Sequence, residues 1–165
     1  MSGPVALIGF GEVGQILAQD LRRAGVRRIR VWDTAFAAPD SGPSRALARH
    51  RVEAFASAAE AAGGVRVVIS AVTAAQAAPA AAATAAGLHP GAFFLDLNSC
   101  SPARKREAFD LVARAAGRYV EAALMSPIGT RRLDSPILLG GPHATDFLPH
   151  ARELGFGRAT VFSRV

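Results

Sequence analysis

The chain opens on a short apolar run that ends directly in a glycine-rich turn. Residues 5–8 are followed by Gly9-Phe10-Gly11-Glu12-Val13-Gly14, which has the spacing G-x-G-x-x-G. A second apolar segment ends at Asp33, nineteen residues beyond Gly14. A strand that turns tightly into a helix needs glycine at these positions, so the pattern predicts a strand–turn–helix unit of a parallel α/β fold.

The same spacing gives each glycine a separate task in a dinucleotide-binding turn. We expect Gly9 to permit the tight turn, Gly11 to leave room for a pyrophosphate, and Gly14 to let the helix lie close to the strand. A helix that begins near Glu12 offers free N–H groups and a positive dipole end to phosphates. Asp33 is placed to accept hydrogen bonds from an adenosine ribose. The alternative is a glycine-rich turn with a purely structural role.

The predicted cofactor is NAD or NADP, with NAD slightly favoured. A carboxylate at Asp33 repels the 2′-phosphate of NADP, whereas Arg45 and Arg49 in the following segment could reverse this preference. The predicted cofactor-binding residues are Gly9, Phe10, Gly11, Glu12, Val13, Gly14, Asp33, Ala71, Val72, Thr73 and Asn98.

Size and composition limit the class of protein. A chain of 165 residues, half of them hydrophobic, is expected to form one domain with a sizeable core. No apolar stretch reaches the length of a spanning helix and no basic leader precedes the first strand, so we expect a cytoplasmic protein without membrane contact. The net charge of +6 would ordinarily indicate nucleic acid, but the arginines are dispersed without interleaved aromatic residues, and we expect no such partner. A single cysteine, Cys100, and scattered histidines predict neither a disulfide nor a metal site.

Strand and helix patterns alternate along the whole length. The predicted strands are residues 5–9, 28–33, 52–55, 65–70, 92–97, 119–125, 136–139 and 159–162. The predicted helices are residues 13–24, 45–49, 57–63, 102–116 and 145–154, with an alanine-rich helix that ends at Gly87. This alternation predicts a single-domain α/β fold with a doubly wound, mainly parallel sheet of the Rossmann type.

Polar and small residues gather where three consecutive predicted strands end. One strand ends in Ala71-Val72-Thr73, the next in Asp96-Leu97-Asn98-Ser99-Cys100-Ser101-Pro102, and the third in Met125-Ser126-Pro127. Ligands of such sheets bind beyond the carboxyl ends of the strands, so these segments predict one shared site. Each segment taken alone is also ordinary loop and cap sequence.

These motifs resemble those of the β-hydroxyacid dehydrogenases, which include 6-phosphogluconate and 3-hydroxyisobutyrate dehydrogenases and the imine reductases. The family's substrate loop, D-x-S-T-x-x-P, is similar to the segment from Asp96 to Pro102, and an acid-Ala pair follows at Glu121-Ala122. A later segment, Leu138-Leu139-Gly140-Gly141-Pro142, resembles a 6-phosphogluconate-dehydrogenase-related subgroup. The resemblance implies hydride transfer to or from a small hydroxy acid or a related carbonyl or imine, with Asn98, Ser99 and Ser126 as catalytic candidates.

Two departures from the family pattern shape the functional expectation. The family's Ser-Gly-Gly clamp is not intact around Ser126, and the chain ends before the position of the family's catalytic lysine and its helical domain. Lys105 is expected to be a solvated surface residue, and Cys100 a small loop residue. We therefore expect the chain to bind cofactor and a small-molecule substrate without turnover on its own. We also expect it to self-associate through apolar surface near Val161 and Phe162.

The alternative function is a non-catalytic dinucleotide-binding module with a redox-sensing or regulatory role, which needs neither the lysine nor the helical domain. A methyltransferase is disfavoured, because its glycine loop usually follows an acidic residue where this chain has Ile8.

Overall fold

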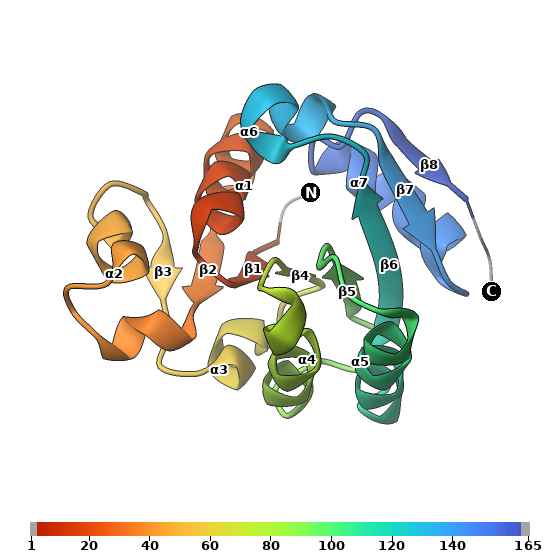
Figure 1. Ribbon diagram of the computed structural model, residues 1–165, viewed down its shortest axis with the longest axis horizontal. Helices are drawn as coiled ribbons and strands as arrows, with labels where there is room; N and C mark the ends of the chain where they lie inside the picture. Colours follow the sequence, from red (N-terminus) through yellow and green to blue (C-terminus); the bar gives the residue numbers. More distant parts are fainter. Residues whose placement is uncertain (1–2, 163–165) are drawn as a thin grey trace.

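The computed structural model describes residues 3–162, which form an eight-stranded sheet wrapped by helices on both faces (Figure 1). The strands are β1 (Val5–Ile8), β2 (Ile29–Trp32), β3 (Glu53–Ala54), β4 (Val67–Ser70), β5 (Phe93–Asp96), β6 (Arg118–Leu124), β7 (Ile137–Gly140) and β8 (Ala159–Val161). Their spatial order is β3-β2-β1-β4-β5-β6-β7-β8. All neighbours are parallel except β6 and β7. The predicted doubly wound, mainly parallel α/β sheet is confirmed.

Two sets of helices cover the two faces of the sheet (Figure 1). The helices are α1 (Glu12–Arg23), α2 (Gly42–Leu47), α3 (Ala58–Ala62), α4 (Ala77–Ala85), α5 (Pro102–Arg114), α6 (Ile128–Arg131) and α7 (Ala144–Glu153). Short 3-10 turns are η1 (Thr34–Ala37), η2 (Ala74–Gln76) and η3 (Arg132–Asp134). Helices α1 and α7 belong to one apolar core, and α3, α4 and α5 to the other.

Strand β1 is buried on both faces, which is why its sequence is continuously apolar. Val5 and Leu7 enter the core beneath α1, whereas Ala6 and Ile8 enter the core beneath α3 and α4. This is the expected pattern for a central parallel strand, because successive side chains point to opposite faces and helices cover both. Because the whole strand is buried, it holds the start of the following glycine turn in place at Gly9.

Helix ends follow local capping chemistry. The Ser57 hydroxyl accepts a hydrogen bond from the Glu60 N–H at 3.1 Å, and Pro102 lies in the first turn of α5. The predicted helix at 45–49 is wrong in its bounds, because Ser41 accepts from the Ser44 N–H at 3.1 Å and starts α2 earlier.

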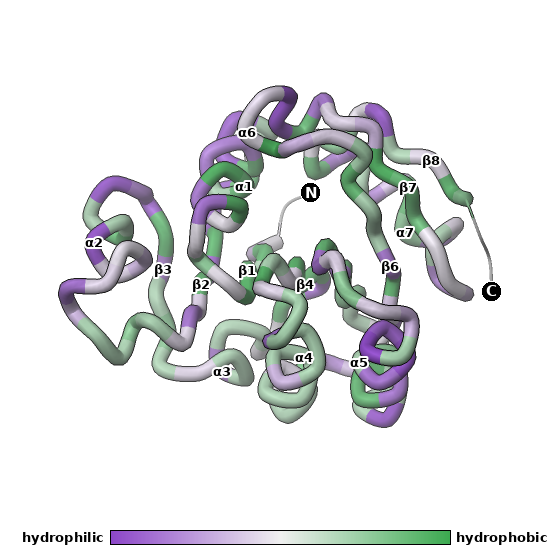
Figure 2. The backbone as a smooth tube through the Cα atoms, viewed as in Figure 1, coloured by the Kyte–Doolittle hydropathy of each residue, from purple (hydrophilic) through white to green (hydrophobic). Residues whose placement is uncertain are grey.

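Helix α4 is weakly apolar along its whole length, which Figure 2 shows in pale green, whereas α5 is largely purple. Alanine supplies most of the side chains of α4, which packs between α3 and α5. Between residues 3 and 162, no helix combines the length and apolar character needed to span a membrane.

Candidate functional site

A cleft of about 1030 Å³ lies at the carboxyl ends of the parallel strands. It sits where the strand order reverses, between β1 and β4, which is the usual ligand position in a doubly wound sheet. Its lining residues are Gly9, Gly11, Glu12, Val13, Trp32, Asp33, Thr34, Ala71, Val72, Thr73, Ala74, Gln76, Pro79, Ala80, Ala83, Leu97, Asn98, Ser99, Leu124, Met125, Ser126, Pro127 and Ile128. The cleft thus brings together all three predicted strand ends and the glycine turn.

The three glycines of the turn have distinct geometries. Gly9 has φ +97°, and a Cβ there would lie 2.3 Å from the Ala71 carbonyl oxygen. A Cβ on Gly14 would lie 2.2 Å from the Gly9 carbonyl oxygen, so α1 approaches the turn too closely for any side chain. A Cβ on Gly11 would meet nothing within 4 Å, and Gly11 lines the cleft. Gly9 and Gly14 are therefore required by the backbone, whereas Gly11 keeps space open in the cleft.

The start of α1 is suited to an anion. Gly11 is the N-cap residue, and no side chain caps the helix, so its first N–H groups have no side-chain partner from the chain. Unpaired N–H groups and the positive end of the helix dipole attract phosphate. Glu12 and Val13, the first two residues of α1, line the cleft.

Asp33 braces the glycine turn as well as lining the cleft. Its Oδ2 accepts a hydrogen bond from the Phe10 N–H at 2.7 Å, and its Oδ1 accepts from the Ala35 N–H at 2.8 Å. The Phe10 side chain is fully buried and packs edge-on against Phe36 and His50, outside the cleft. Phe10 can therefore contribute only backbone to a ligand, and the ribose contact of Asp33 stays a prediction.

Among the residues that line the cleft, the charged ones are Glu12 and Asp33, and none is basic. Arg45 instead donates to the backbone carbonyl of Asp40, and Arg49 lines a separate small hollow with Arg22 and Arg51. Among residues 3–162, those that line the cleft offer backbone N–H groups, but no cationic side chain, to an anionic ligand.

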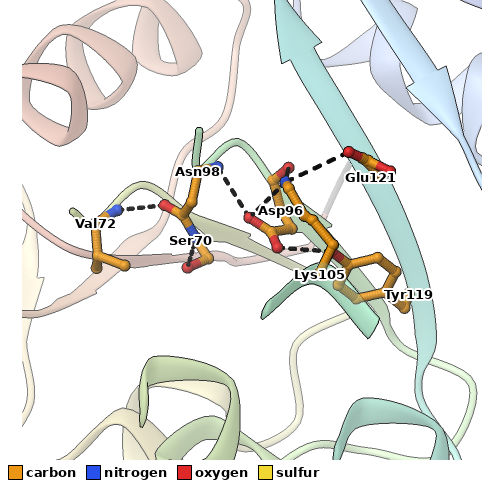
Figure 3. Close-up of polar contacts among 7 residues, drawn as sticks. All are labelled: Ser70, Val72, Asp96, Asn98, Lys105, Tyr119 and Glu121. Atoms are coloured by element: carbon orange, nitrogen blue, oxygen red, sulfur yellow. Dashed lines mark hydrogen bonds and ion pairs between the residues drawn. The ribbon is translucent and has the colours of Figure 1, made fainter. Parts of the chain in front are cut away.

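Asn98 ties the first and second strand-end segments together, after β4 and β5 (Figure 3). Its Oδ1 accepts from the Val72 N–H at 2.6 Å, and its Nδ2 donates to the Ser70 Oγ at 3.0 Å. Asn98 is only 3% exposed, so most of its amide is used within the protein. Its catalytic assignment stays a prediction, and its visible task is to join the loops after β4 and β5.

A buried carboxylate lies behind Asn98 (Figure 3). Asp96 is fully buried; its Oδ1 accepts from the Asn98 N–H at 2.9 Å, and its Oδ2 accepts from the Tyr119 hydroxyl at 2.7 Å. The Lys105 Nζ lies 3.2 Å from Asp96 Oδ1 and donates to the Asp96 carbonyl, also at 3.2 Å. Burial, reinforced by the charge of Asp96, raises the pKa of Tyr119 well above its usual value.

The expectation that Lys105 is a solvated surface residue is wrong. Lys105 is 8% exposed and lies on the buried face of α5 with Ala108 and Val112. Positions 105, 108 and 112 follow helical spacing, so the periodicity of α5 contained the signal. Its partner Asp96 comes from a different element, which the sequence of the helix does not reveal.

The two predicted serines differ in their surroundings. Ser99 is exposed in the cleft. Ser126 also lines the cleft, but its Oγ lies 2.8 Å from the Oγ of the fully buried Ser135. Ser99 is therefore the freer hydroxyl, and both catalytic assignments stay predictions.

A clamp holds the wall of the cleft that contains Ser126. The Arg132 Nε donates to Asp20 Oδ1 at 2.8 Å and Oδ2 at 3.0 Å, and the Arg132 Nη2 donates to Gln19 Oε1 at 3.0 Å. Asp20 is 7% exposed on α1, and Arg132 adopts φ +55°. The pair fastens α6 and η3 to α1; the sequence contained no local sign of it, because the partners are 112 residues apart.

Cys100 is half-buried beside this site, and burial raises the pKa of its thiol. The thiol form is therefore favoured over the nucleophilic thiolate. Within residues 3–162, no three His, Cys, Asp or Glu side chains are grouped so that they could hold a metal ion.

The family model of the NAD binding domain of 6-phosphogluconate dehydrogenase matches residues 4–140. No curated protein matches the sequence significantly. A conserved hypothetical protein from Sinorhizobium meliloti is 32% identical with a TM-score of 0.87, and the match covers 100% of this chain and 55% of that protein.

Two further solved structures share the fold at lower identity. A Mycobacterium tuberculosis 3-hydroxyisobutyrate dehydrogenase, solved with L-serine, is 24% identical with a TM-score of 0.81, covering 99% of this chain and 54% of that chain. An imine reductase from Myxococcus stipitatus, solved with NADP+, is 19% identical with a TM-score of 0.79, covering 98% and 55%; a variant was solved with NAD+. This chain thus spans little more than half the length of these relatives.

Proposed function

This chain belongs to the family of NAD-binding domains of 6-phosphogluconate dehydrogenase, and from that membership we propose that it binds NAD in preference to NADP for hydride transfer involving a small hydroxy acid or a related carbonyl or imine. The observation that carries the proposal is the cleft at the strand switch point, which combines the open space at Gly11 with an uncapped helix start.

The residues of the cleft fit the parts of a dinucleotide in order. The pyrophosphate would lie over Gly11 at the start of α1, where a side chain would occupy its space. The adenosine ribose would lie beside Asp33, next to Trp32 and Thr34 at the end of β2. The nicotinamide would then extend past Val72 and Thr73 toward Asn98 and Ser99, in the half of the sheet formed by β4, β5 and β6.

The charge of the cleft supports the preference for NAD. A 2′-phosphate would lie close to the carboxylate of Asp33, and no arginine or lysine lines the cleft to offset the repulsion. Arg45, whose charge could have reversed the preference, is bound to the Asp40 carbonyl. Two such charges near a protein surface repel by on the order of 1–4 kcal/mol.

The chemistry of hydride transfer is supplied by the nicotinamide when it is bound, and the chain's own residues orient it. Val72 and Asn98 form a fixed wall, because the Val72 N–H is held by the Asn98 amide. The exposed hydroxyl of Ser99 lies in the cleft, where it could donate to or accept from an oxygen or nitrogen of a small substrate.

Isothermal titration calorimetry of the purified chain with NADH and NADPH tests this proposal. We expect NADH to bind and NADPH to bind about tenfold more weakly or worse. Asp33→Asn should narrow the difference between the two cofactors, because it removes the repelling charge and keeps the size of the side chain. Equal or tighter NADPH binding by the unaltered chain would overturn the preference, and absence of binding to either cofactor would overturn the function.

A further inference from the structure

The pair formed by Lys105 and Asp96 has no place in the cofactor contacts described above. Asp96 is fully buried, Lys105 is nearly so, and neither lines the cleft. A buried ion pair contributes little to stability by itself, because removing both charges from water offsets their attraction. The pair lies directly behind the cleft wall, because Asp96 contacts Asn98, which lines the cleft.

A continuous chain of hydrogen bonds leads from the ammonium of Lys105 to the cleft (Figure 3). Lys105 contacts Asp96 Oδ1 at 3.2 Å, and the same oxygen accepts the Asn98 N–H at 2.9 Å. The Asn98 amide then holds the Val72 N–H at 2.6 Å and the Ser70 hydroxyl at 3.0 Å. These contacts link Lys105 on α5 to the ends of β4 and β5.

Asp96 receives three contacts: its carboxylate accepts from the Asn98 N–H and the Tyr119 hydroxyl, and it lies beside the Lys105 ammonium. Lys105 is the only cation among the three partners. Glu121 faces the same ammonium at 4.0 Å but is half exposed, so it does not replace Asp96 as the partner.

We infer that Lys105 is a positioning residue for the nicotinamide side of the cleft, acting through Asp96 to fix Asn98 and Val72. The inference rests on the proposed function, since it assigns the β4–β5 loops to the nicotinamide half of the ligand. The adenosine side is built from the glycine turn, Trp32 and Asp33, which have no hydrogen bond to this chain of contacts.

The test compares two ligands that differ in the nicotinamide. NADH and ADP-ribose share the adenosine and pyrophosphate, so dissociation constants for both are measured by calorimetry in Lys105→Met, Lys105→Arg and the unaltered chain. We expect Lys105→Met to weaken NADH binding about tenfold and to leave ADP-ribose binding within about twofold. Lys105→Arg keeps the cation and should recover part of the NADH affinity.

Arg106→Met is the matched control, because Arg106 is the exposed neighbour of Lys105 on α5 and should change neither affinity. If Lys105→Met does not fold by circular dichroism, Tyr119→Phe takes its place. That variant removes one donor to Asp96 without leaving an unpaired buried charge, and we expect a smaller loss confined to NADH.

The outcomes separate this inference from the proposed function. Equal losses of NADH and ADP-ribose affinity in the folded variants would mean that Lys105 only stabilises the fold, and unchanged NADH affinity would remove its role altogether; either result overturns the inference. If the unaltered chain binds neither NADH nor ADP-ribose, the proposed function itself is overturned.

Discussion

The fold does not require glycine at position 11, whereas the proposed ligand needs the open space there. The backbone of Gly11 is ordinary, with φ −71°, and a side chain there would meet no protein atom within 4 Å. We therefore expect Gly11→Val to fold with nearly unchanged stability and to lose NADH binding, because the valine would occupy the space over the helix start. Titration of NADH fluorescence measures the affinity.

Gly157→Val is the matched control, since Gly157 also has open space around it and does not line the cleft. It should bind NADH like the unaltered chain. A folded Gly11→Val protein with normal affinity would contradict the assignment of the pyrophosphate to this turn.

Tyr119 offers a pH prediction with a clear sign. It is the single tyrosine of the chain, and burial together with Asp96 raises its pKa above the ordinary value near 10. Below that value the hydroxyl is protonated in both states; above it only the unfolded chain ionises. Folding stability should therefore fall as the pH rises beyond about 10.

Absorbance at the tyrosinate band, followed beside circular dichroism, measures this directly. We expect tyrosinate to appear only together with unfolding. Ionisation of Tyr119 in a protein with intact secondary structure would contradict the buried hydrogen bond to Asp96. Tyr119→Phe should lose this part of the alkaline sensitivity.

At the level of single residues, the sequence predicted roles that depend on local spacing and missed those that depend on partners. The demands on Gly9 and Gly14 followed from the motif and are confirmed by the backbone geometry. The use of the Phe10 N–H by Asp33, and of Lys105 by Asp96, arises only when separate strands come together.

The clamp between α1 and the α6–η3 segment makes a prediction at the level of elements. Arg132→Ala leaves the nearly buried Asp20 with Arg23 as its remaining partner, so we expect a loss of about 2 kcal/mol in the free energy of unfolding. Arg132→Gly should lose about 1 kcal/mol less, because glycine relieves the cost of φ +55°.

Urea denaturation measures these differences, with Arg131→Ala as the control at the exposed neighbouring position. Equal stability of Arg132→Ala and the unaltered chain would show that the clamp does not hold the cleft wall. A glycine variant less stable than the alanine variant would contradict the strain at this position.

Among the elements, long periodic segments were predictable and single turns were not. Every predicted strand is present, with ends that differ by a few residues. The segments η1, η2, α6 and η3 were missed because a single turn carries no periodicity and takes its form from tertiary contacts such as that of Arg132 with Asp20. The antiparallel direction of β7 was likewise not predicted, since alternation gives no strand direction.

For the whole molecule, the cleft contains few groups able to move a proton. Its lining residues include no lysine or histidine, and the single lysine of the chain is held behind the wall by Asp96. Positioned proton transfer typically contributes ~10²–10⁴-fold to a rate. We therefore expect the 165-residue chain to bind NADH without measurable turnover.

A steady-state assay of NADH formation against a panel of small hydroxy acids checks this expectation, with a full-length dehydrogenase as positive control. Robust turnover would mean that Ser99, Ser126 or a bound water suffices for proton transfer. Light scattering on the same sample tests the predicted self-association, for which the 79% exposure of Phe162 is the supporting observation.

Trp32 is the single tryptophan of the chain, and it lies in the cleft wall at the end of β2. All indole emission of the protein therefore comes from the adenosine side of the candidate site. A ligand that fills only that side would alter the environment of the indole, whereas a reduced nicotinamide would in addition accept its excitation energy. The fluorescence of Trp32 can therefore distinguish occupancy of one half of the cleft from occupancy of both halves, without any added label.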